Sequence, residues 1–157
     1  MNGITIAVLG AAIATFLSGT GSAIGVAVAG RASAGVISEK PDLFGRTLIL
    51  QALPGTQGIY GFLIAILILS KIGLLGGAGG AAITLEQGWT LFAAGATIGV
   101  AGLTSAIYQG KAAAASILMT AKRPEMSARG MTITALVETY AILALLVSIL
   151  IWSAVQL

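Results

Sequence analysis

The sequence contains neither cysteine nor histidine, and charged residues make up only 8% of its 157 positions. The lack of cysteine excludes disulfides, thiol nucleophiles and cysteine-bound zinc, and the lack of histidine removes the commonest general base. Soluble domains carry about one quarter charged residues, so this chain is predicted to be a membrane protein. Its eight basic residues are not gathered on an aromatic-bearing polar surface, which argues against nucleic acid as a partner.

Hydrophobic residues account for 57% of the chain and fall into four long apolar runs. Each run exceeds the roughly 20 residues that a helix needs to cross the hydrocarbon core of a bilayer. The runs therefore predict an all-α membrane protein with four transmembrane helices, over residues 4–37, 44–72, 85–120 and 128–155. The N-terminus lacks the basic start of a cleavable signal peptide, so we expect the first span to remain in the mature protein.

Two short charged turns and one glycine-rich segment separate the predicted spans. Each charged turn holds a proline: SEKPDL begins at Ser38 and AKRPEMS begins at Ala121. Proline cannot donate to a helix and charged side chains prefer water, so these segments are predicted to be hairpin turns. The glycine-rich segment, residues 73–82, disfavours helix. We expect two helical hairpins, residues 1–76 and 77–157, that together form one membrane domain.

Basic residues are concentrated at one end of the predicted helices. Seven of the eight flank the two charged turns, whereas Lys71 lies at the opposite end. Loops rich in lysine and arginine tend to stay in the cytoplasm. The charged turns are therefore predicted to be cytoplasmic, with both termini outside.

The two halves of the chain resemble one another at a single constant offset, without a gap. Matched pairs include Ser22 with Ser105, Pro41 with Pro124, Arg46 with Arg129, and Thr56 with Thr139. A register shared over such a length predicts a duplicated helical hairpin. In the same register Gly55 meets Glu138, so only one half carries a carboxylate.

Glu138 is the only acidic residue deep inside a predicted span. It follows Arg129 by nine residues, which is about 13 Å along a helix at 1.5 Å per residue. An acidic side chain at such a depth costs about 2.5 to 3.5 kcal/mol on translocon scales, so it marks a functional site by default. The alternative is a structural carboxyl that stays protonated and hydrogen-bonded.

The second span contains an unusually polar stretch for a membrane helix, LPGTQGIYGF over residues 53–62. Four of its residues share one helix face at spacings of three, four and seven: Leu53, Thr56, Gln57 and Tyr60. Pro54 has no N–H group, so it leaves the Leu50 carbonyl without its helical donor and predicts a kink.

Gln109 in the third span supplies a further amide if its helix packs beside the second and fourth spans. The set then holds a carboxylate, two amide oxygens, a hydroxyl and a backbone carbonyl, with a phenol to orient the carboxylate; hard oxygens suit a hard cation. A proton needs only a carboxyl in an apolar setting, whereas dehydrated Na⁺ needs several oxygens, which favours Na⁺.

Taken singly, these residues also have structural explanations: the proline and glycines suit a kink, the threonine hydroxyl can bond to its own helix backbone, and the glutamines can join helices. Lys111 would be costly near such a site, but it is turned about 200° from Gln109.

The first and third spans differ in bulk from the second and fourth. They are rich in Gly, Ala and Ser, with GxxxG spacings at Gly21/Gly25 and Gly95/Gly99, and small residues let helix backbones approach closely. The other two spans carry bulky Ile, Leu and Val. This difference suits an assembly with a tight inner layer and a lipid-facing outer layer. Ordinary packing within one four-helix bundle is the alternative.

These residues resemble the duplicated proteolipid, called subunit K, of V-type and A-type rotary ATPases. The resemblance covers essentially the whole chain and is most specific where LPGTQG occurs together with LVETYAI and YQGKAAAA. It implies a homo-oligomeric rotor ring in which Glu138 carries the ion. In sodium-translocating members, the matched ligands are the Leu53 carbonyl, Thr56, Gln57 and Gln109, and Tyr60 matches a tyrosine that bonds the carboxylate.

The resemblance also implies a setting for the protein. We expect a non-catalytic, multi-pass subunit of a prokaryotic plasma membrane, with Na⁺, or H⁺ in its place, as cargo and no organic cofactor. Its expected partners are further copies of the chain, the stator membrane subunit, lipid, and central-stalk subunits at the cytoplasmic loops near Arg46 and Arg129. The alternatives are a proton-translocating ring, a small four-helix proton-coupled multidrug transporter, and a purely structural channel or scaffold.

Overall fold

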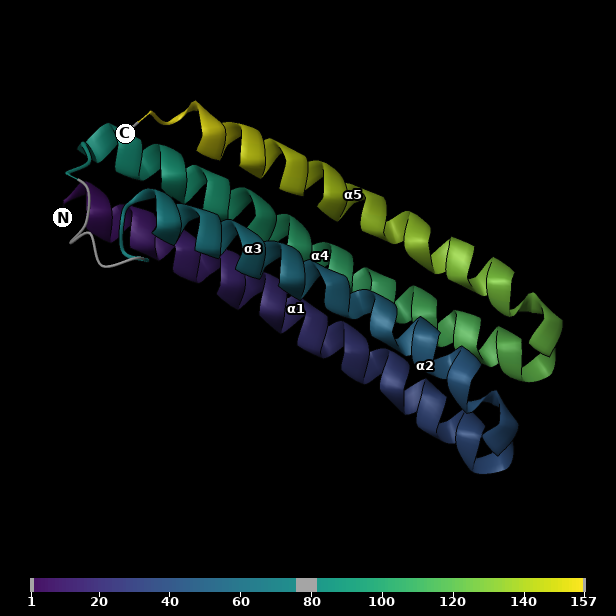
Figure 1. Cartoon of the computed structure of the whole chain (residues 1–157). Helices are drawn as coiled ribbons and strands as arrows, with labels where there is room; N and C mark the ends of the chain where they lie inside the picture. The colour runs from purple at the N-terminus through teal and green to yellow at the C-terminus, as the bar shows by residue number, and fades with distance from the viewer. Residues whose placement is uncertain (1, 76–81, 157) are drawn as a thin grey trace.

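The computed structural model of the chain describes residues 2–75 and 82–156. Within these residues all regular elements are helices, arranged as long rods lying side by side (Figure 1). Four stretches are long and apolar enough to cross a membrane, as the sequence predicted. The start of α1 and the end of α5 lie at one end of the rods, and the two charged turns lie at the other (Figure 1). The expected hairpin boundary between residues 76 and 77 falls outside the described residues.

Three of the four spans are continuous helices, and the second is divided. The continuous ones are α1 (Gly3–Glu39), α4 (Leu85–Lys122) and α5 (Ser127–Ala154). The second span consists of α2 (Phe44–Ala52) and α3 (Thr56–Lys71), separated by the 3₁₀ turn η2 (Leu53–Gly55). Pro54 lies inside this turn, where its missing N–H interrupts the α-helical bonding pattern. The disturbance predicted at Pro54 is therefore present as a 3₁₀ turn.

Glycines bring α1 and α4 into close contact. A Cβ atom added at Gly10 would lie 2.6 Å from the Cα of Phe92, and one added at Gly21 would lie 2.6 Å from the Cα of Leu103. Only residues without a side chain permit so short a distance between two helix backbones. The close approach predicted for the first and third spans is confirmed within the chain.

The two other rods lie outside this pair, with α3 against α1 and α5 against α4 (Figure 1). Buried apolar side chains such as Ile64, Ile68 and Ile98 fill the space between α1, α3 and α4. By contrast, α5 exposes large apolar residues, with Leu136 65% and Leu150 58% exposed. Exposed side chains of this kind suit a surface that faces lipid or another copy of the chain.

The two charged turns are short 3₁₀ segments that begin at the matched prolines. They are η1 (Pro41–Leu43) and η3 (Pro124–Met126), which confirms the predicted hairpin turns. Long basic side chains tie the turns together, since Lys40 Nζ donates to the Ala121 carbonyl at 2.6 Å and Arg46 Nη1 donates to the Pro124 carbonyl at 2.7 Å. These bonds fix one hairpin against the other at this end.

Candidate functional site

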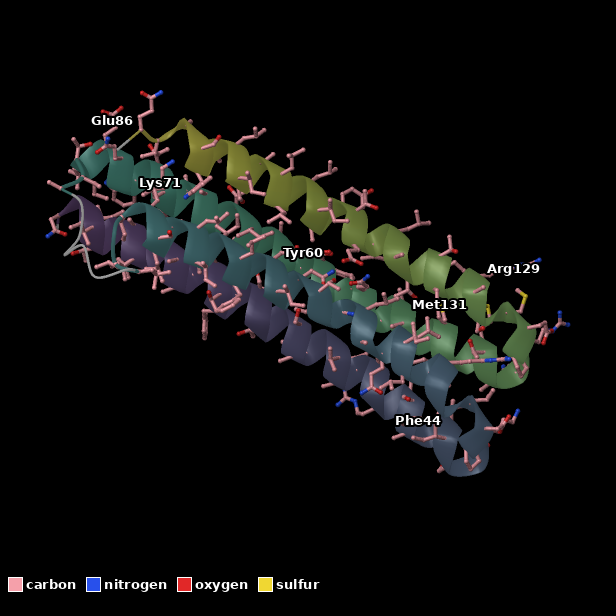
Figure 2. All side chains as sticks on the ribbon, in the orientation of Figure 1. Phe44, Tyr60, Lys71, Glu86, Arg129 and Met131 are labelled. Carbon is pink, nitrogen blue, oxygen red and sulfur yellow. The ribbon has the colours of Figure 1, made fainter. Side chains whose placement is uncertain are left out.

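The carboxylate of Glu138 on α5 receives hydrogen bonds from two other helices. The Tyr60 hydroxyl on α3 donates to Glu138 Oε1 at 2.5 Å, and Gln109 Nε2 on α4 donates to Oε2 at 3.2 Å. Tyr60 lies near the middle of the rods, far from Glu86 at one end and Arg129 at the other (Figure 2). The carboxylate is thus held deep in the predicted membrane region by two uncharged donors.

Two fully buried glutamines continue the network away from Glu138. Gln57 and Gln109 each have no exposed surface. Gln109 Nε2 also donates to the Thr134 carbonyl at 3.2 Å, and its Oε1 accepts from Gln57 Nε2 at 2.6 Å. The nitrogen and oxygen of a buried amide both need hydrogen-bond partners. The partners found here therefore determine the orientation of each amide group in this structure.

Three oxygens gather where the 3₁₀ turn passes into α3. The Thr56 hydroxyl lies 3.0 Å from the Leu53 carbonyl oxygen and 3.4 Å from Gln57 Oε1. Oxygens bound at about 2.3 to 2.6 Å to one hard cation lie about 3.3 to 3.7 Å apart when they subtend a right angle. The Thr56 hydroxyl is therefore close to such a separation from each of the other two oxygens.

The structure brings the residues singled out in the sequence into one region. Tyr60, Gln57, Gln109 and Glu138 form a continuous chain of hydrogen bonds, and Thr56 extends it to Leu53. Pro54 is buried in the turn that precedes Thr56. The Gln109 oxygen faces Gln57 while its nitrogen faces Glu138, which the sequence did not predict. Lys111 is exposed, and its Nζ lies 4.8 Å from the centre of the exposed Tyr108 ring.

Ser105 on α4 also belongs to the network, although the sequence identified it only as the partner of Ser22 in the repeat. Its hydroxyl donates to the Val137 carbonyl at 3.1 Å and accepts from Gln57 Nε2 at 3.2 Å. A serine in a small-residue helix is common, so its type carries little signal. Its spacing of four residues before Gln109, which puts both on one helix face, is the one signal in the sequence from which it could have been found.

A family model described as the C subunit of ATP synthase matches the chain twice, over residues 9–68 and 92–151. The two matches are separated by the same constant offset that relates Ser22 to Ser105, so they coincide with the repeated hairpins. Together they span most of the chain.

Individual proteins are similar to this chain over nearly all of its length. V-type sodium ATPase subunit K of Enterococcus hirae is 46% identical over 148 residues, covering 94% of this chain and 90% of that protein. A-type ATP synthase subunit K of Methanocaldococcus jannaschii is 42% identical over 142 residues, covering 90% of this chain and 59% of that protein. The 16 kDa proteolipid of the V-type proton ATPase of Nephrops norvegicus is 28% identical over 146 residues, covering 93% and 89%.

Three observations lead to one assignment: the duplicated hairpins, the Glu138 carboxylate bonded between α3, α4 and α5, and the similarity to proteolipids along the chain. The chain belongs to the family of the ATP synthase C subunit, as a duplicated membrane proteolipid of the subunit K type found in V-type and A-type rotary ATPases.

Proposed function

We propose that this proteolipid forms a homo-oligomeric rotor ring that carries Na⁺ across the membrane while the soluble head of the complex turns over ATP. The chain itself is the carrier and catalyses no reaction. The observation that carries the proposal is the hydrogen-bond network around Glu138. Its carboxylate accepts from the Tyr60 phenol and the Gln109 amide, and Gln57 connects Gln109 to the group of three oxygens at the 3₁₀ turn. A negative charge beside several neutral oxygens is suited to a hard monovalent cation.

Sodium is favoured over the proton because of what the site contains beyond the carboxylate. Protonation of Glu138 requires no further oxygen, whereas Na⁺ gives up its water and needs replacements. The proposed ligands are the Glu138 carboxylate, the Leu53 carbonyl, the Thr56 hydroxyl and the Gln57 and Gln109 amide oxygens. Tyr60 orients the carboxylate, and Pro54 supports the site by shaping the turn that presents Leu53. The sodium ATPase subunit of E. hirae, at 46% identity, is in keeping with this choice.

Transport follows from the neutralisation of Glu138. Bound cation and carboxylate together carry no net charge, so an occupied site can pass through lipid at little cost, whereas bare Glu138 facing lipid is costly. Release takes place where a positive group of the stator membrane subunit attracts the carboxylate.

The orientation proposed for the ring follows from its charges. Basic residues flank η1 and η3, so these turns lie in the cytoplasm, near the central-stalk subunits, and the termini lie outside a prokaryotic plasma membrane. Arg46 and Arg129 lie at this end of the rods. The exposed apolar side chains of α5 face lipid or the stator.

Carbodiimide labelling of Glu138 in the purified membrane complex tests the sodium site. A hydrophobic carbodiimide reacts with a protonated carboxyl in an apolar setting, so bound Na⁺ protects the residue. We expect protection that rises with sodium concentration at a fixed, mildly acidic pH and is absent with added potassium at equal ionic strength. Mass spectrometry locates the adduct. Labelling that depends on pH but ignores sodium would identify a proton ring instead.

Replacement of the carboxylate tests whether Glu138 is the carrier. In Glu138→Gln the amide keeps the size and the hydrogen-bonding capacity of the side chain but cannot neutralise a cation. We expect the ring to assemble while transport by reconstituted complex falls to background. Transport at more than a few per cent of the unmodified level would show that another group carries the ion.

A further inference from the structure

Ser105 occupies a position between three helices that no other hydroxyl shares in the described part of the site. It belongs to α4, it accepts from Gln57 on α3, and it donates to the Val137 carbonyl on α5. Only 7% of its surface is exposed. Val137 immediately precedes Glu138, so Ser105 joins the helix that carries the carboxylate to the helix that carries the oxygen group.

The hydroxyl of Ser105 has a single hydrogen, and it donates this hydrogen to the Val137 carbonyl. Toward Gln57 the Ser105 oxygen can therefore act only as an acceptor. An acceptor at this place requires the amide nitrogen of Gln57 to point toward α4. The amide oxygen of Gln57 is thereby turned toward Thr56, where it lies 3.4 Å from the Thr56 hydroxyl.

Gln109 provides the second acceptor for the Gln57 amide nitrogen, at 2.6 Å. The same Gln109 oxygen is a proposed cation ligand, and it points away from the carboxylate while Gln109 Nε2 donates to Glu138. For that oxygen to reach a cation beside Glu138, the Gln109 amide has to turn. A turned Gln109 amide presents its N–H group, another donor, to Gln57 Nε2, so Gln57 loses this acceptor and Ser105 is the acceptor that remains.

We infer that Ser105 is a positioning residue for cation selectivity, which holds the Gln57 oxygen toward the cation when Gln109 turns its own oxygen to Glu138. The inference rests on the proposed sodium site. A proton bound to Glu138 makes no use of the Gln57 oxygen, so Ser105 affects sodium binding and leaves proton binding unchanged.

The test compares sodium protection of Glu138 in complexes carrying Ser105→Ala, Ser105→Thr or no substitution. Loss of one buried hydrogen bond of ordinary strength corresponds to about a fivefold change in affinity. We expect Ser105→Ala to need about five times more sodium for half-protection. Without sodium, the pH at which labelling is half-maximal stays the same, which a general disturbance of the site would not allow.

Ser105→Thr restores the hydroxyl and is expected to return the sodium requirement to that of the unmodified complex. Ser105 lines an open apolar groove of about 320 Å³ between α4 and α5, so the added methyl group has unfilled volume beside it. Thr104→Ala is the matched control: the Thr104 hydroxyl is exposed and bonds to the Val100 and Ala101 carbonyls of its own helix. This substitution should leave sodium protection unaltered.

The outcomes separate this inference from the proposed function. If sodium protects the unmodified complex and Ser105→Ala equally well, the positioning role is wrong and the sodium site stands. If Ser105→Ala also shifts the sodium-free pH profile or prevents ring assembly, Ser105 is a structural residue and the inference fails. If sodium does not protect the unmodified complex, the proposed sodium site fails and the role of Ser105 in selectivity fails with it.

Discussion

The two donors to Glu138 differ in how firmly other hydrogen bonds hold them. The Tyr60 hydroxyl can release Glu138 Oε1 by rotation of one side chain, whereas Gln109 is also tied to the Thr134 carbonyl and to Gln57. Charged acceptors form the stronger hydrogen bonds, so both contacts stabilise the carboxylate over an isolated one in lipid. Among the residues that the structure describes, no lysine or arginine bonds to the Glu138 carboxylate, so no fixed positive charge there would compete with the proposed cation.

The candidate site was predictable in part from single residues. A lone glutamate in a membrane span and a cluster of polar residues around Pro54 are rare enough to attract attention in the sequence. Ser105 was missed because serine is ordinary among small residues, and its importance depends on which atoms surround it. The direction of the Gln109 amide was equally hidden, since a glutamine side chain offers a donor and an acceptor at the same place.

A stability prediction concerns Ser148 on α5. Its hydroxyl is fully buried and has no hydrogen-bond partner among the residues that the structure describes. An unsatisfied buried polar group costs about 1 to 3 kcal/mol. Ser148→Ala should therefore raise the thermal stability of the purified ring, by the equivalent of about 1 kcal/mol, as measured by its dissociation temperature in detergent.

Thr134→Val provides the opposite comparison on the same helix. The Thr134 hydroxyl donates to the Gly130 carbonyl at 2.8 Å and lies 3.1 Å from Ser116 Oγ. Its removal should lower the dissociation temperature. A loss of stability in both variants would indicate that Ser148 has a partner in the assembled ring.

Helices α1 and α4 form the framework on which the site is mounted. Their backbones approach each other at glycines. At these positions even a small apolar side chain would be too large. Gln57 and Glu138, on α3 and α5, are joined through Gln109 on α4. Because α3 packs against α1 and α5 packs against α4, the separation of α1 from α4 also affects the distance between the two outer helices.

Gly10→Ala tests this framework. The added Cβ would lie 2.6 Å from the Cα of Phe92, and neither backbone can move aside without separating the helices. Overpacking of this kind costs about 1 to 3 kcal/mol. Gly35→Ala is the control, because a Cβ at Gly35 has no atom within 4 Å and alanine is the better helix former. We expect Gly10→Ala to lower the dissociation temperature of the ring and Gly35→Ala to preserve or raise it; equal behaviour would contradict the close contact.

The element boundaries were largely predictable because membrane spans obey simple limits of length and polarity. The four predicted spans match the observed helices to within a few residues, and both prolines at the charged turns start 3₁₀ segments. The interruption at η2 was foreseeable from Pro54. Its form was not, since a proline in a membrane helix is compatible with either a bend or a tightened turn.

At the scale of the whole molecule, the two ends of the rods differ in charge and in the contacts that join the two hairpins. The turn end is tied by Lys40 and Arg46 across the two hairpins. At the other end Lys71 Nζ donates to the Trp152 carbonyl at 2.6 Å and lies 4.4 Å from the centre of its ring. Both ends therefore resist separation of the hairpins, while the Glu138 site lies between them.

The absence of cysteine allows a direct test of membrane orientation. Single cysteines in Glu125→Cys and Gln156→Cys place one thiol at each end of the rods, both at exposed positions. In intact cells, a membrane-impermeant maleimide should label Gln156→Cys and should reach Glu125→Cys only after permeabilisation, because the basic turns face the cytoplasm. The reverse pattern would invert the proposed topology.

The sequence by itself determined that this is a four-span membrane protein made of two repeated hairpins, with one carboxylate deep in its last span. Span length, basic bias and repeat register are properties of the chain that need no knowledge of neighbours. Only the tertiary structure decided that Ser105 joins the site, that Gln109 turns its nitrogen to Glu138, and that Ser148 has no partner among the described residues. Helical periodicity fixes which residues share a face, but the rotation and offset between packed helices decide which atoms meet.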